Sequence, residues 1–65
     1  MKIEIKRQGT ETKNLKFSGT VTQLLSKLNI NPVEVLVAKN GAIVELDEKL
    51  TDKDEVTIFS VVSGG

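Results

Sequence analysis

One amphipathic helix constrains the fold of this chain more than any other feature of its sequence. Thr20 and Gln23 fit a capping box, in which the Thr20 side chain accepts from the N–H of Gln23 and the Gln23 side chain reaches back to the N–H of Thr20. Apolar residues follow at the i, i+3, i+4 and i+7 spacing of one helix face, namely Val21, Leu24, Leu25 and Leu28. Asn29 can adopt the left-handed stop conformation, Ile30 can pack back onto the helix, and Pro32 prevents continuation. A helix with one apolar stripe needs a sheet to cover.

The residues before the helix predict a β-hairpin. Residues 2–7 alternate, with Ile3 and Ile5 on one side and charged residues on the other, which indicates a strand with one buried face. Gln8, Gly9 and Thr10 predict a turn, and residues 14–17 alternate again and predict the returning strand, with Leu15 and Phe17 on one side.

The residues after the helix predict three more strands. Residues 34–39 contain an unbroken apolar run, Val35 to Ala38, which is typical of an interior strand. Asn40-Gly41 is a strong type I′ hairpin signal, and residues 42–45 form the return strand. Leu46 and Leu50, four apart, predict a single helical turn at one end of the core. Residues 51–54 form a polar turn, and residues 55–62 form the last strand.

This order of elements predicts an α+β fold of the β-grasp type, a mixed sheet of four to five strands with one main helix on one face. The first and last strands run parallel at the centre of the sheet, because the connection between them contains the helix. We expect residues 1–62 to form this domain and residues 63–65, Ser-Gly-Gly, to form a flexible tail.

The composition argues against several classes of function. The chain has no Cys and no His, so it lacks thiolate ligands, disulfides and the usual general base, and we do not expect an enzyme or a bound metal. A net charge of +0 and only two aromatic residues argue against nucleic-acid binding. The chain shows neither an apolar run long enough for a membrane span nor a secretory signal pattern, so we expect a cytoplasmic protein. We also expect it to be monomeric when free.

Charge is distributed unevenly along the chain. Residues 1–33 contain six basic and two acidic residues, whereas residues 34–65 contain three basic and seven acidic residues. The two halves can simply attract each other within a solvated surface. Alternatively, the acidic half steers a basic partner towards the tail, and the salt dependence of the association rate distinguishes these interpretations.

The chain closes on Val61, Val62, Ser63, Gly64 and Gly65. Glycine adds no packing and costs backbone entropy to order, so paired glycines do not stabilise a strand end. Lacking Cβ atoms, Gly64 and Gly65 can pass through a channel too narrow for other residues and deliver an α-carboxylate to a partner's active site. The alternative is an ordinary frayed end.

Several motifs together resemble the ThiS/MoaD family of ubiquitin-like sulfur carriers, its archaeal small modifier-like members included. They are the hairpin, a helix beginning Thr-Val-x-Gln-Leu-Leu, the Asn-Gly turn, a Leu-x-Asp-x-Asp-Glu-Val approach to the last strand, Phe59, and the closing Val-Ser-Gly-Gly. Lys53 stands where the family usually has Gly, so we expect a less favourable backbone conformation there. Ser60 and Val61 replace prolines typical of molybdopterin-synthase small subunits, which argues against that branch.

The resemblance implies a carrier rather than a catalyst. An E1-like enzyme would use ATP with Mg to adenylate the Gly65 carboxylate, and sulfur from a persulfide would convert it to a thiocarboxylate. The acceptor would be a molybdopterin synthase large subunit, a thiazole synthase for thiamine, or a tRNA thiolase, and the chain itself would bind no cofactor. One alternative is a protein modifier joined through Gly65 to lysines of target proteins. Another is a non-covalent ubiquitin-like interaction domain with an inert tail.

The last strand also predicts a docking surface. If Val56 and Ile58 face the helix, Phe59 and Val61 face away from it, and the neighbouring strand adds Leu36. Such an apolar patch beside the tail is typical of an interface, and the family resemblance also implies an aromatic residue at this place. The alternative is the reverse parity, which would bury Phe59.

Overall fold

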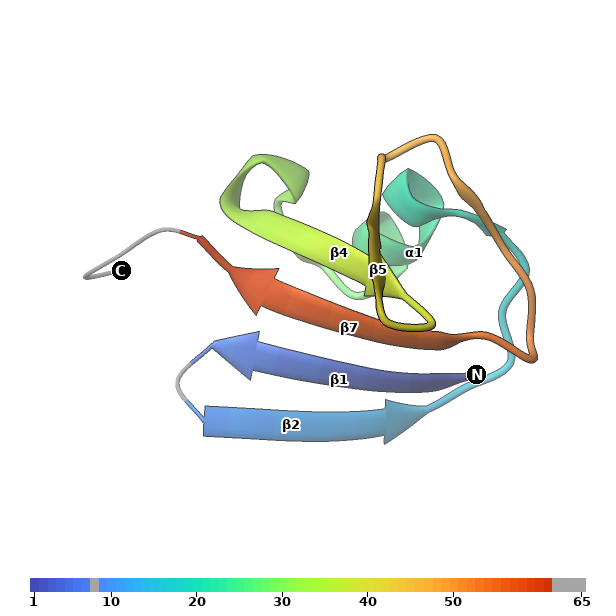
Figure 1. Ribbon diagram of the computed structural model, residues 1–65, viewed down its shortest axis with the longest axis horizontal. Helices are drawn as coiled ribbons and strands as arrows, with labels where there is room; N and C mark the ends of the chain where they lie inside the picture. Colours follow the sequence, from blue (N-terminus) through green and yellow to red (C-terminus); the bar gives the residue numbers. More distant parts are fainter. Residues whose placement is uncertain (8, 62–65) are drawn as a thin grey trace.

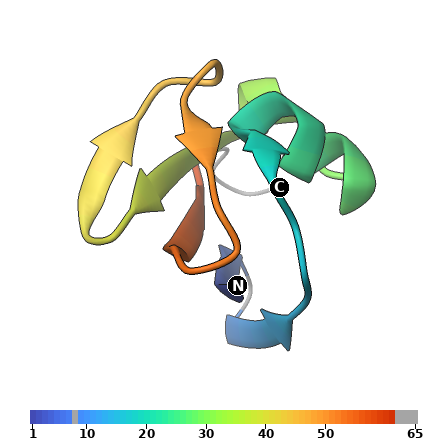
Figure 2. The same ribbon diagram turned by 90° about the vertical axis from the view of Figure 1, so that its right-hand side faces the viewer.

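The described part of the protein forms a five-stranded mixed sheet with one α-helix packed on one of its faces, and a separate pair of short strands (Figures 1 and 2). The computed structural model describes residues 1–7 and 9–61. The sheet strands are β1 (Lys2–Arg7), β2 (Gly9–Asn14), β4 (Val35–Lys39), β5 (Ala42–Val44) and β7 (Glu55–Ser60), in the order β2-β1-β7-β4-β5. Strands β1 and β7 pair in parallel and the other pairs are antiparallel. The predicted β-grasp fold is therefore confirmed.

The helix α1 (Val21–Lys27) forms where the sequence predicts it, and its capping box is present. The N–H of Gln23 donates to Thr20 Oγ1 at 3.2 Å, and the N–H of Thr20 donates to Gln23 Oε1 at 2.9 Å. Asn29 ends the helix with φ +64°, and the N–H of Ile30 donates to the Leu25 carbonyl at 2.9 Å. Among the described residues, no helix is long and apolar enough to cross a membrane.

The core lies between α1 and the sheet. α1 contributes Val21, Leu24 and Leu25, and the facing strands contribute Ile3 and Ile5 from β1, Val56 and Ile58 from β7, and Val35 and Val37 from β4. No polar side chain among the described residues is buried. The domain is therefore held by apolar packing between two layers.

The second strand of the N-terminal hairpin was predicted wrongly. It spans Gly9–Asn14 rather than residues 14–17, and Gly9, with φ +102°, pairs directly with Arg7. Every residue of β2 is exposed, so this edge strand has no apolar alternation to reveal it. Leu15 and Phe17 pack against the core from the segment after the strand.

The helical turn expected at Leu46 and Leu50 is also wrong. Leu46 is exposed, and Leu50 is buried in the short strand β6 (Lys49–Leu50), which pairs with β3 (Gly19–Thr20). The start of α1 holds this segment in place, because the first N–H groups of a helix need acceptors. The N–H of Val21 donates to the Glu48 carbonyl and that of Thr22 to the Leu46 carbonyl, both at 3.0 Å.

The turn between β4 and β5 has the backbone that Asn-Gly predicts, with φ +51° at Asn40 and +90° at Gly41. Among the described non-glycine residues, only Asn29 and Asn40 have positive φ. Lys53 therefore adopts an ordinary backbone conformation, and the strain expected there is absent. A 3-10 helix, η1 (Pro32–Glu34), joins the end of α1 to β4.

Candidate functional site

The candidate site is the end of β7 from which the predicted tail continues. Val61 is the last described residue, and its N–H donates to the Glu34 carbonyl at 3.0 Å, which ties this end to η1. β7 lies between β1 and β4 at the centre of the sheet (Figure 1). Val62 and the predicted tail residues Ser63, Gly64 and Gly65 lie outside the described residues. The described chain thus ends one residue beyond a strand that has a neighbour on each side.

Three apolar residues, which we call the β7 patch, lie beside this point on the face of the sheet opposite α1. They are Leu36, Phe59 and Val61. Val56 and Ile58 are buried towards the helix, so strand alternation turns Phe59 to the other face, where its side chain is half-buried. Leu36 is 49% exposed and pairs directly with Phe59, and Val61 is 50% exposed. The structure thus brings Phe59 and Leu36 together on the face of the sheet away from α1, as expected.

A cation at this patch was not anticipated from the sequence. Lys6 of β1 pairs with Phe59 across the parallel ladder, and its Nζ lies 5.6 Å from the centroid of the ring. A cation over the face of an aromatic ring at this distance is attracted to it and restricts its orientation. The alternation of β1 places Lys6 on the open face, but only the register of β1 against β7 places it at Phe59.

The clearest carboxyl pKa shifts occur at the opposite end of β7 and have structural causes. The N-terminal ammonium of Met1, 3.2 Å from Asp52 Oδ1, and the N–H of Phe17 lower the pKa of Asp52. The N–H of Thr51, which donates to Asp54 at 2.8 Å, is the main cause that lowers the pKa of Asp54. These carboxylates hold the turn before β7, at the end of that strand away from the β7 patch.

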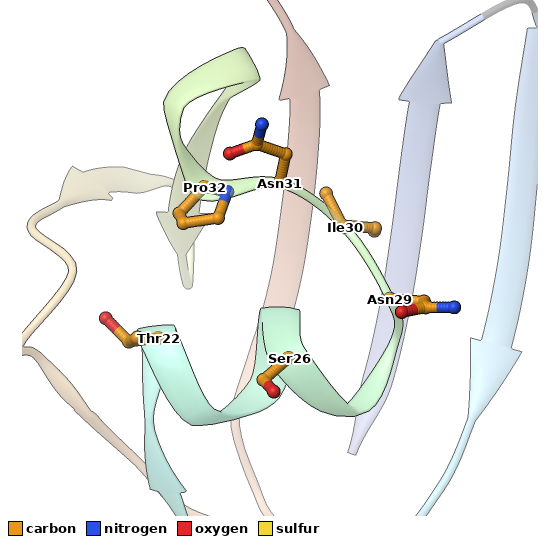
Figure 3. A pocket seen from close by; sticks show the side chains of 6 residues that line it. All are labelled: Thr22, Ser26, Asn29, Ile30, Asn31 and Pro32. Carbon is orange, nitrogen blue, oxygen red and sulfur yellow. The ribbon is translucent and has the colours of Figure 1, made fainter.

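A hollow at the C-terminal end of α1 offers no acid–base chemistry (Figure 3). Its lining residues are Thr22, Ser26, Asn29, Ile30, Asn31 and Pro32, none of them ionisable. Thr22 Oγ1 already donates to the Leu46 carbonyl, and Asn31 Oδ1 accepts from the N–H of Val33. Within residues 1–7 and 9–61 there is also no group of three or more His, Cys, Asp or Glu side chains that could hold a metal ion. The β7 patch therefore remains the candidate site.

Comparison of the sequence with models of known protein families gives a match over nearly the whole chain. The model of the ThiS family matches residues 3–65, so the match includes both the sheet and the closing glycines. Curated proteins show no match to the chain.

Proposed function

The chain belongs to the ThiS family of small ubiquitin-like sulfur carriers, and on this premise we propose that it carries sulfur as a thiocarboxylate at Gly65. The observation that carries the proposal is the family match over residues 3–65. It is supported by the absence of Cys and His from the sequence, which leaves the chain without a thiol nucleophile and without the usual general base.

The proposed chemistry begins with a carboxylate, which is a poor electrophile because its charge is delocalised. In the active site of an E1-like enzyme, a Gly65 carboxylate oxygen attacks the α-phosphorus of Mg-bound ATP and pyrophosphate leaves. The acyl-adenylate then has a good leaving group, and a persulfide sulfur attacks the carbonyl carbon and displaces AMP. A second thiol attacks the donor sulfur of the resulting acyl disulfide, so that the donor and this thiol end as a disulfide and the thiocarboxylate leaves for a sulfur-accepting enzyme.

In this proposal the fold contributes a docking surface for the partner and holds the end of β7, from which the tail continues. The β7 patch docks on the partner, because half-exposed apolar side chains gathered beside a functional segment favour burial in an interface. The hydrogen bond from Val61 to Glu34 holds the last described residue against η1. Gly64 and Ser63 then pass the carboxylate through a narrow channel, and the absence of a Cβ at Gly64 makes that passage possible.

Deleting Gly65 tests the proposal. We expect the truncated protein to lose ATP–pyrophosphate exchange with its E1-like enzyme, because the new terminal carboxylate falls short of the α-phosphate. The thermal unfolding midpoint should stay unchanged, since the core lies within residues 3–58. Normal exchange by the truncated protein would contradict the mechanism. Gly-Gly remnants on lysines of other proteins would instead favour the modifier alternative.

A further inference from the structure

A groove lies between the start of β4 and the segment that follows β5, next to the end of β7. Its volume is about 640 Å³, within the range of about 300–1,000 Å³ that is typical of ligand sites. We call it the β4 groove, and its lining residues are Pro32, Val35, Leu36, Val37, Ile43, Val44, Glu45, Leu46 and Asp47. We propose that the β4 groove binds an extended segment of a partner protein in which apolar and basic residues alternate.

The lining of the β4 groove favours apolar side chains. Ile43 is 59% exposed and Leu46 is 42% exposed, and both lie beside the exposed Leu36. Ile43 pairs with Ala38, which shares the face of Leu36, so the apolar surface continues across β4 and β5. A partner side chain that covers these residues removes apolar surface from water.

The edge of β4 favours a partner in extended conformation. Val61 N–H donates to the Glu34 carbonyl, so the backbone of Glu34 faces β7. The backbone N–H and C=O groups of successive residues in an antiparallel strand point to opposite edges. Those of Leu36 therefore point to β7, and those of Val35 point to the opposite edge. On that edge β5 pairs only with residues 37–39, and β4 begins before β5 lies alongside it (Figure 1). Among the described strands, none lies beside the outward-facing backbone of Val35, so a short extended segment of a partner can hydrogen-bond to Val35 before it reaches β5.

The negative charge on one side of the β4 groove favours a basic partner. Glu45 and Asp47 line one side of the β4 groove. The ion pairs among the described residues are Met1–Asp52, Lys13–Glu11 and Lys39–Glu48, and neither groove carboxylate takes part in one. Lysine or arginine side chains that alternate with the apolar residues of a bound strand can therefore face carboxylates that no described cation neutralises.

The β4 groove is separate from the proposed sulfur chemistry. It shares only Leu36 with the β7 patch, and binding in it requires neither adenylation nor Gly65. The two tests are consequently independent. The Gly65 deletion can lose adenylation without losing peptide binding, and a groove variant can lose peptide binding without losing adenylation.

The test uses the full chain, labelled with nitrogen-15, and a short end-blocked peptide that alternates valine with lysine. We expect the peptide to shift the backbone amide resonances of Val35, Leu36, Ile43 and Leu46. An otherwise identical peptide with glutamate in place of lysine should bind at least about threefold more weakly at low salt, because its charges face Glu45 and Asp47. Equal binding of the two peptides, or shifts confined to β2, would overturn the proposal.

Two variants of exposed apolar residues provide a matched pair. Leu46→Ser removes an apolar side chain from the groove, and we expect it to weaken binding of the valine–lysine peptide about fivefold. Val33→Ser alters a residue that is 78% exposed and does not line the groove, and its binding should be unchanged. Equal effects of the two substitutions would place the peptide elsewhere.

Discussion

Phe59→Ala is expected to weaken docking on a partner while leaving the protein folded. Truncating a fully buried phenylalanine costs about 3–5 kcal/mol. The ring of Phe59 is only half-buried and lies on the open face of the sheet, so the loss of packing should be well below that range. Including about 0.5 kcal/mol for the contact with Lys6, we expect the free energy of unfolding to fall by about 1–2 kcal/mol.

The neighbouring Ile58 provides the control for stability. It is 0% exposed and faces α1, so Ile58→Ala should cost about 2–5 kcal/mol. Urea unfolding followed by far-ultraviolet circular dichroism measures both variants. A loss of about 3 kcal/mol or more for Phe59→Ala, equal to that for Ile58→Ala, would place the ring in the core and refute the assignment of Phe59 to the β7 patch.

Binding provides the second measurement for the same variant. Truncating an aromatic hot spot at the centre of an interface costs about 2 kcal/mol or more, so we expect the Kd for the E1-like enzyme to rise about tenfold or more. Titration calorimetry with the folded variant measures this change. An unchanged Kd would mean that the β7 patch does not contact that enzyme.

Two further predictions concern stability. The pKa values of Asp52 and Asp54 are lowered from 3.8 in the folded protein, so their stabilisation is present above that value and is lost as the pH falls through the lowered folded values. Asp54→Asn should therefore flatten the decline of urea midpoints in acid, and a wild-type slope in this variant would contradict the assignment. Asn29 has φ +64°, so Asn29→Ala should cost about 1 kcal/mol in urea unfolding whereas Asn29→Gly should be neutral or stabilising. Equal losses for both variants would show that the Asn29 side chain, rather than its backbone, sets the cost.

The parts of the fold with strong local signals could be predicted from the sequence. The capping box fixes the start of α1, and Asn40-Gly41 fixes the β4–β5 turn, because each depends on a few adjacent residues. β2 was misplaced because an edge strand exposed on both faces needs no apolar alternation. Leu46 and Leu50 have helical spacing, but the N–H groups at the start of α1, far away in sequence, bind the carbonyls of that segment.

Some features of the candidate site also follow from local sequence patterns, whereas others depend on strands that are distant in sequence. Strand alternation alone predicts that Phe59 and Val61 share the face away from α1, and the position of Leu36 follows from the apolar run of the next strand. The contact of Lys6 with Phe59 depends on the register of two strands that are distant in sequence. The β4 groove depends on how far β5 extends along β4, which no local pattern specifies.

The most direct test of the central claim is the intact mass of the protein after incubation with its E1-like enzyme, Mg-ATP, a persulfide donor and a reductant, with fragmentation to locate any change. We predict the mass shift of a single oxygen-to-sulfur exchange, located at the carboxylate of Gly65. An unchanged mass while the enzyme forms the adenylate, or sulfur located at any other residue, would contradict the proposal that this chain is a sulfur carrier.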